Sequence, residues 1–239
     1  MAAKDKIILA LDVSSEREAV DLVKELKDCV GPFKVGLELF SSAGPGIMDS
    51  LRKAGAERIF YDGKFHDIPN TVAGAAGAAA RMGVWMFNVH ASGGTAMMRA
   101  AVVGASDEVR RLGVEPPLIL GVTVLTSISG EILRDELSVP VLLENQVTHL
   151  AELAQNAGLD GVVASPQEIL PVKAACGSKF LVVTPGVRPA WAGANDQKRV
   201  MTPSEAIRNG ADYIVIGRAI TAAEDRRSAA EQIIAEMEE

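Results

Sequence analysis

The sequence predicts an α/β protein, a single (β/α)8 barrel of the TIM type that spans residues 1–239 as one catalytic domain. Two observations lead to this fold class. Short apolar segments alternate with longer segments of helical periodicity along the whole chain, which is typical of repeated βα units with a parallel sheet. Glycine-centred segments also recur at regular intervals. Gly158 and Gly210, for example, lie 52 residues apart, which corresponds to two units of 26 residues. About eight such units fit into 239 residues, the number in a (β/α)8 barrel.

Each expected strand is a short run of apolar and β-branched residues that follows a turn or a glycine. In order, we expect strands near residues 6–12, 33–39, 58–63, 84–90, 117–124, 160–164, 179–184 and 212–217. The segments between them are expected to be helical. In the first of these, over 15–29, Ser15 is a suitable cap, and the apolar residues Ala19, Leu22, Val23 and Leu26 share one face.

Three segments support an internal repeat, over residues 54–60, 157–163 and 209–215. In each, a glycine suited to end a helix precedes a strand. A doubly wound open sheet is the alternative fold. However, no Gly-x-Gly-x-x-Gly motif follows the first strand, and no Gly/Ser/Pro-rich linker divides the chain, so a single barrel domain is favoured.

Composition excludes several classes of function. The chain has 24 Lys and Arg against 31 Asp and Glu, a net charge of −7, and nucleic acids and anionic membranes both require a basic surface. Residues 71–89 are weakly polar but contain Arg81 and several glycines, so no membrane span is expected. Cys29 and Cys176 lack the spacing of a zinc site, and the N-terminus lacks a signal-peptide core. We therefore expect a cytoplasmic protein with reduced thiols and no bound metal.

Charged residues gather where the predicted strands end, and in a barrel this is the edge that carries the active site. Asp62 and Lys64 are two residues apart on one strand, so both side chains should point to the same face. A buried ion pair there would be costly to desolvate and is therefore indicative of function, whereas a solvated salt bridge at the rim is the structural alternative.

The segment Asp62-Gly63-Lys64-Phe65-His66-Asp67-Ile68-Pro69 resembles the Asp-x-Lys-x-x-Asp-Ile-Pro signature of the orotidine 5′-phosphate decarboxylase family. Further matches lie at Leu11-Asp12, Lys34, residues 123–126, residues 185–189, Gln197 and Gly217-Arg218. The resemblance thus covers almost the whole chain. It implies a homodimeric (β/α)8 barrel that converts orotidine 5′-monophosphate to UMP in pyrimidine biosynthesis, without a metal or an organic cofactor.

The resemblance also implies a role for each matched residue. Lys34, Asp62, Lys64 and Asp67 would form the catalytic array, with Asp67 supplied by the neighbouring subunit and Lys64 as the proton donor to C6. The expected substrate-binding residues are Asp12 and Lys34 at the ribose, Thr126 at the pyrimidine, Ile68 and Thr71 at the neighbour's site, and Pro185, Arg188, Gln197, Gly217 and Arg218 toward the phosphate. Residues 189–197 are expected to form a lid over the phosphate.

Simpler interpretations remain open for several of these residues. Asp67, Thr71 and Thr126 are all suited to cap helices, and Ile68 is suited to apolar packing. His66, His90 and His149 have no metal-ligand spacing and receive no role. The alanine-rich run over 73–80 predicts a closely packed interface helix.

Two other functions compete with the decarboxylase. A sugar-phosphate lyase of the same superfamily, such as 3-keto-gulonate-phosphate decarboxylase or hexulose-phosphate synthase, would use Mg²⁺ and an acidic residue near the position of Lys34. A lysine there repels a divalent cation, and Glu38, expected on the same strand, is a poorly placed substitute. A non-catalytic nucleotide-binding barrel would keep Arg188 and Arg218 but lose the charged array, which this chain retains.

Overall fold

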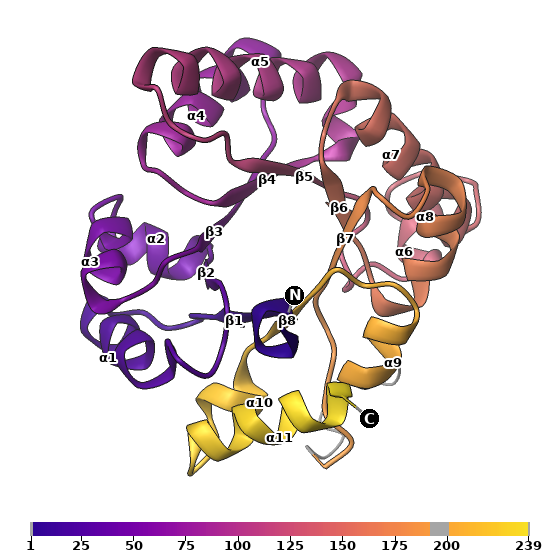
Figure 1. Cartoon of the computed structure of the whole chain (residues 1–239). Coiled ribbons are helices and arrows are strands. Elements are labelled where there is room, and N and C mark those ends of the chain that lie inside the picture. The colour runs from indigo at the N-terminus through magenta and orange to yellow at the C-terminus, as the bar shows by residue number, and fades with distance from the viewer. Residues whose placement is uncertain (1, 192–200, 239) are drawn as a thin grey trace.

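Eight parallel strands close into a barrel in the order β1 to β8 in the computed structural model, which describes residues 2–191 and 201–238 (Figure 1). The strands are β1 (Ile7–Ala10), β2 (Phe33–Val35), β3 (Ile59–Phe65), β4 (Met86–His90), β5 (Leu118–Val122), β6 (Gly161–Val163), β7 (Leu181–Thr184) and β8 (Tyr213–Ile216). The last strand pairs with the first, Ile8 opposite Val215, so the sheet has no free edge. The predicted (β/α)8 barrel is confirmed.

Helices surround the strands on the outside of the barrel (Figure 1). They are α1 (Glu16–Leu26), α2 (Leu37–Ala43), α3 (Ile47–Ala54), α4 (Pro69–Arg81), α5 (Gly94–Leu112), α6 (Gly130–Asp135), α7 (Leu143–Ala157), α8 (Ile169–Cys176), α9 (Pro203–Arg208), α10 (Arg218–Thr221) and α11 (Arg226–Glu238). Three short 3-10 helices join them: η1 (Ala3–Lys6), η2 (Ala91–Gly93) and η3 (Pro166–Glu168). None of the helices in the described ranges is both long and apolar enough to cross a lipid bilayer.

The alternation of side chains along the strands builds two apolar layers. On β1, Ile8 and Ala10 point into the barrel, while Ile7 and Leu9 point outward to the helices. The inner layer is completed by Phe60, Met86, Leu120, Val183, Tyr213 and Val215. Because both faces of each strand are covered, β1 is buried at all four positions, as expected for a parallel barrel.

The repeated glycines end helices as the sequence predicts. Gly55, Gly158 and Gly210 follow α3, α7 and α9, and their φ angles of +113°, +91° and +104° lie in the left-handed region. The acids two residues after the last two glycines tie neighbouring strands together. Asp160 Oδ2 accepts from the backbone N–H of Ile119 at 2.7 Å, and Asp212 Oδ2 accepts from that of Val182 at 2.8 Å.

The strand expected over residues 33–39 is wrong beyond Val35. Gly36 ends β2, and α2 begins at Leu37, so Glu38 lies in the first turn of a helix and not on the strand of Lys34. The apolar residues at 35, 37 and 39 alternate as they would on a strand, and this local pattern concealed the helix start. Glu38 is therefore even less suited to serve as the acidic Mg²⁺ ligand that a sugar-phosphate lyase would need near the position of Lys34.

The alanine-rich helix α4 packs closely against α5 of the same chain. A Cβ atom added at Gly104 of α5 would lie only 2.2 Å from the carbonyl oxygen of Ala73 on α4, so this contact requires a glycine. The small residues over 73–80 thus serve a helix contact within the barrel. Their expected part in an interface between subunits stays a prediction.

Candidate active site

Two cavities open at the carboxyl ends of the strands and share part of their walls. The larger, of about 550 Å³, extends to the loops after β7 and β8, and the smaller, of about 200 Å³, extends to the loop after β5. Lys34, Asp62, Pro185 and Val215 line both. The described residues therefore form one elongated site with charged side chains at its middle, the edge of a barrel where active sites lie.

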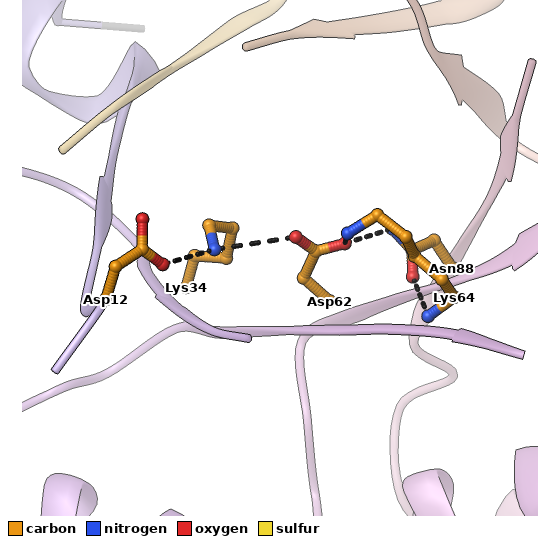
Figure 2. A network of polar contacts seen from close by, with 5 residues as sticks. All are labelled: Asp12, Lys34, Asp62, Lys64 and Asn88. Carbon is orange, nitrogen blue, oxygen red and sulfur yellow. Dashed lines mark hydrogen bonds and ion pairs between the residues drawn. The ribbon is translucent and has the colours of Figure 1, made fainter. Parts of the chain in front are cut away.

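A chain of charged groups crosses the middle of this site (Figure 2). The Nζ atom of Lys34 lies 3.0 Å from Asp12 Oδ1 and 3.4 Å from Asp62 Oδ2. On the other side, Lys64 Nζ donates to Asp62 Oδ1 at 2.7 Å. The ammonium and carboxylate groups therefore alternate in the order Asp12, Lys34, Asp62, Lys64.

The site holds Asp62 in its ionised form. Burial by itself raises the pKa of this carboxyl group, but the charges of Lys34 and Lys64 and the hydrogen bonds from Lys64 and Asn88 more than compensate, so the pKa lies below its ordinary value. The side chains of Asp62 and Lys64 are 14% and 28% exposed. The pair is therefore closer to the buried ion pair than to a solvated salt bridge at the rim.

The backbone of β3 is irregular where it carries the two catalytic candidates. Tyr61 pairs with Phe87 and Phe65 pairs with Val89, so three residues of β3 lie opposite Asn88 alone on β4. Within this bulge Lys64 has a φ angle of +47°, a left-handed conformation that is rare for a residue with a side chain. Asp62 and Lys64 do share a cavity, as predicted, although the strand between them is not regular.

Asn88 is the site residue that the sequence analysis missed. Its carboxamide donates from Nδ2 to Asp62 Oδ1 at 2.7 Å and accepts at Oδ1 from the backbone N–H of Lys64, also at 2.7 Å. The side chain is fully buried. A polar residue at an inward position between the apolar residues Met86, Phe87 and Val89 of β4 is the signal that was available.

The larger cavity ends at two arginines and a glycine. Arg188 follows β7, and Gly217-Arg218 connects β8 to α10. Val187 forms a parallel bridge with Met201, and the backbone N–H of Arg188 donates to the carbonyl of Met201 at 3.1 Å, which fixes the position of Arg188 on the loop. Gln197 and most of the expected lid, residues 192–197, lie outside the described residues.

The smaller cavity is mostly apolar and ends at Thr126. Its apolar lining consists of Phe60, Val122, Val124, Leu125, Val163, Ala164, Pro185 and Val215. Thr126 lies in the turn between β5 and α6, and the cap of α6 is Ser129, so the helix-cap interpretation of Thr126 is wrong. Its hydroxyl is therefore available at a cavity wall.

The signature loop after β3 lies on the surface, outside both cavities. Ile68 is 66% exposed, so the interpretation as a packed apolar residue is wrong. Asp67 and Thr71 are exposed as well, and neither is the cap of α4, since that position is Ile68. Asp67 Oδ1 instead accepts from the backbone N–H of Ile68 at 2.6 Å. The other candidate residues that the structure describes lie together at the two cavities, whereas Asp67, Ile68 and Thr71 lie apart from them.

The donor set at the centre of the site is unsuited to a divalent cation. The ammonium group of Lys34 lies between Asp12 and Asp62, where a cation would have to bind their carboxylates. Like charges repel, and a lysine offers no lone pair to a metal while it is protonated. Within residues 2–191 and 201–238, no cluster of three His, Cys, Asp or Glu side chains has the arrangement of a metal site.

A closed parallel barrel with an ionised, partly buried charge network at its carboxyl edge has the organisation of a (β/α)8 enzyme. The family model described as "Orotidine 5'-phosphate decarboxylase / HUMPS family" matches residues 5–233. The chain belongs to this family.

Relatives and solved structures agree with that assignment. Orotidine 5'-phosphate decarboxylase from Moorella thermoacetica is 54% identical over 238 residues, which are 100% of this chain and 94% of the relative. The protein of the same name from Syntrophomonas wolfei is 52% identical over 240 residues, with both chains fully covered. The crystal structure of orotidine 5'-phosphate decarboxylase from Lactobacillus acidophilus is 39% identical, covers 98% of this chain and 100% of its own, and has a TM-score of 0.86.

Proposed function

We propose that this chain decarboxylates orotidine 5′-monophosphate to UMP in the biosynthesis of pyrimidine nucleotides, without a metal or an organic cofactor. Family membership supports a carboxy-lyase of this kind. The observation that carries the proposal is the elongated site, with arginines at one end, a mostly apolar pocket with a threonine at the other, and the alternating charges between them. A nucleoside monophosphate has the same order of parts: phosphate, ribose and base.

Each part of the site is assigned to one part of the substrate. The phosphate is held by the side chains of Arg188, Arg218 and Gln197 and by the backbone at Gly217. Guanidinium groups give forked, charged hydrogen bonds, and a glycine permits close approach. Asp12 and Lys34 bind the ribose hydroxyls, and Thr126 binds the pyrimidine edge. Pro185 contributes to the wall that both cavities share.

The chemistry centres on Lys64 and Asp62. The bond between C6 and the carboxylate carbon breaks, CO₂ leaves, and the electron pair stays on C6 in the plane of the ring, where the ring carbonyls cannot delocalise it. The Lys64 ammonium stabilises this charge and then transfers a proton from Nζ to C6. Asp62, ionised at 2.7 Å from Lys64 Nζ, keeps that group protonated and oriented before the reaction.

We further propose a homodimer in which Asp67 of one subunit completes the charged array of the other, with Ile68 and Thr71 beside it. The exposure of this loop supports the idea, since Ile68 is an apolar side chain that is 66% exposed in the single chain. Within its own chain, Asp67 is bound to a backbone N–H group and is not part of the network in Figure 2.

The two cysteines of the chain are buried and unpaired, which is consistent with a reducing compartment, and we assign the protein to the cytoplasm.

The test is the loss of orotidine 5′-monophosphate absorbance with purified protein in excess EDTA, followed by identification of the product. We expect UMP to form at the same rate with EDTA as without it. The magnesium-dependent sugar-phosphate lyase would instead show no turnover of this nucleotide, and activity on a keto-sugar phosphate would appear only after Mg²⁺ is added. Tight binding of UMP with no turnover of either substrate would identify a non-catalytic nucleotide-binding barrel.

A further inference from the structure

The irregular segment of β3 is held by a single side chain of the neighbouring strand. In a regular parallel ladder, the backbone N–H of Lys64 would find a carbonyl on β4, but the bulge between Tyr61 and Phe65 removes that partner. The side-chain oxygen of Asn88 takes its place at 2.7 Å. A buried N–H group without an acceptor costs free energy, so this bond stabilises the left-handed conformation of Lys64.

The other end of the same carboxamide binds the catalytic carboxylate. Asn88 Nδ2 and Lys64 Nζ both donate to Asp62 Oδ1, each at 2.7 Å, while Lys34 lies at Oδ2 (Figure 2). The chemistry of the partners fixes the orientation of the amide, because a carboxylate only accepts and a backbone N–H only donates. The carboxamide of asparagine supplies one donor and one acceptor on a rigid planar group at every pH, whereas an ionised Asp lacks the donor and Leu lacks both.

We propose that Asn88 is a positioning residue for the decarboxylation. By holding the Asp62 carboxylate and the Lys64 backbone at once, it sets where the lysine ammonium points and how the carboxylate faces it. The side chain of Asn88 is 0% exposed and lines neither cavity, so it acts through Asp62 and Lys64 and not on the substrate. This inference rests on the proposed decarboxylase function.

The first test is Asn88→Leu, which keeps a buried side chain of similar size and removes both hydrogen bonds. We expect kcat to fall about 100-fold, the effect of a misplaced catalytic group, while affinity for UMP is retained because phosphate and ribose contacts are untouched. The acid limb of the pH profile should also move to higher pH, since Asp62 loses a hydrogen bond that lowers its pKa. Unchanged kcat in a folded variant overturns the inference.

The second test, Asn88→Asp, separates positioning from a merely structural role. When protonated, the introduced carboxyl group can donate to Asp62 and accept from the Lys64 N–H, as the amide does. When ionised, it repels Asp62, so the rate of this variant should fall as pH rises, whereas Asn88→Leu should show no such fall. The titratable groups around position 88 are Asp62 and Lys64 on β3, Lys34 beyond them, and His90 on its own strand, whose pKa is lowered by burial. A profile of wild-type shape overturns the inference.

Thr184→Val is the matched control. Thr184 is fully buried near the end of β7, and its hydroxyl has no hydrogen-bond partner among the described residues, so the substitution removes a buried polar group without breaking a contact. Its kcat and pH profile should equal those of the wild type. Thermal unfolding of all three variants should be recorded, and a parallel loss of stability, UMP binding and kcat in both Asn88 variants assigns Asn88 a structural role and overturns the inference. If the wild-type protein itself leaves orotidine 5′-monophosphate unchanged, the proposed function fails instead.

Discussion

At the amino-terminal end of the barrel, Asp160 and Asp212 accept hydrogen bonds from backbone N–H groups, whereas at the carboxyl-terminal end Asp62 faces two lysines. At Asp160, partial desolvation outweighs the hydrogen bonds from backbone N–H groups, that of Ile119 among them, so the pKa of this carboxyl group is raised. Asp62 is more deeply buried, with a side chain that is 14% exposed, but Lys34 and Lys64 outweigh the desolvation cost, and its pKa is lowered. The two pKa shifts have opposite directions because the cations that lower the pKa of Asp62 have no counterpart at Asp160 among the described residues.

The comparison indicates a division of labour between the two ends. At the amino-terminal end, Asp160 and Asp212 fasten one strand to the start of the next, and Arg58 pairs with Asp5 and lies over the ring of Trp85 at 5.3 Å from its centroid. These contacts stabilise the closed sheet. At the carboxyl-terminal end, the charges line cavities, where a bound substrate can use them. Substitutions at the two ends should therefore affect different measurements.

The largest effect is expected for Lys64→Ala at the carboxyl-terminal end. Without the ammonium group, neither charge stabilisation nor protonation of C6 takes place, and kcat should drop by at least about 10⁴-fold. Binding of UMP, measured by calorimetry, should remain. Lys53→Ala, an exposed lysine at the end of α3, is the control and should have normal activity. Turnover of wild-type rate in Lys64→Ala would sink the proposed mechanism.

Arg218→Ala should affect binding more than chemistry. Loss of its charged hydrogen bonds to the phosphate should weaken UMP about 10- to 100-fold. The exposed Arg227 on α11 offers a matched control, because Arg227→Ala removes the same charge away from the cavity. Equal UMP affinity in the two variants would remove Arg218 from the phosphate site.

Asp212→Ala should change stability and leave activity intact. Asp212 Oδ2 accepts from Lys173 Nζ at 2.7 Å and from the Val182 N–H at 2.8 Å, and both donors lose this partner. The free energy of unfolding, measured with urea, should fall by about 1–3 kcal/mol, the cost of leaving such groups unsatisfied. Glu231→Ala, at an exposed position of α11, should change it little. A loss of kcat without a loss of stability would contradict the assignment of this end to the framework.

The smallest expected effect is a change in the pH dependence of stability in Asp160→Asn. A raised folded-state pKa means that Asp160 supports folding below its unfolded pKa, and this contribution is lost as pH rises through the folded pKa. The amide can still accept from Ile119 but does not ionise. The variant should therefore be slightly more stable than the wild type at neutral pH, and the difference should vanish in acid. Urea unfolding across this pH range measures it, and a variant that is less stable at pH 7 would show that the charge itself is stabilising.

Sequence patterns are sufficient to find some residues of the candidate active site but not others. Asp12, Lys34, Asp62 and Lys64 were found because strand ends in a barrel meet at one edge, and the structure brings them into one network. Asn88 was missed because its importance depends on the bulge in β3, which shifts the register between β3 and β4 and brings Asn88 to Asp62, 26 residues earlier in the chain. The second predicted strand was also too long, because it was expected to continue past Gly36, where β2 ends. Alternating apolar residues occur both on strands and where a helix begins.

The sequence by itself determined the succession of strands and helices, the glycines that end helices, and the edge at which charged residues gather. These properties depend on local periodicity and backbone preference, which act over a few residues. Only the tertiary structure decided that Lys34 lies between Asp12 and Asp62, that Ile68 is exposed, and that Asn88 joins Asp62 to Lys64. Such contacts depend on strand register and on the closure of the barrel, and neither is encoded within a single segment of the chain.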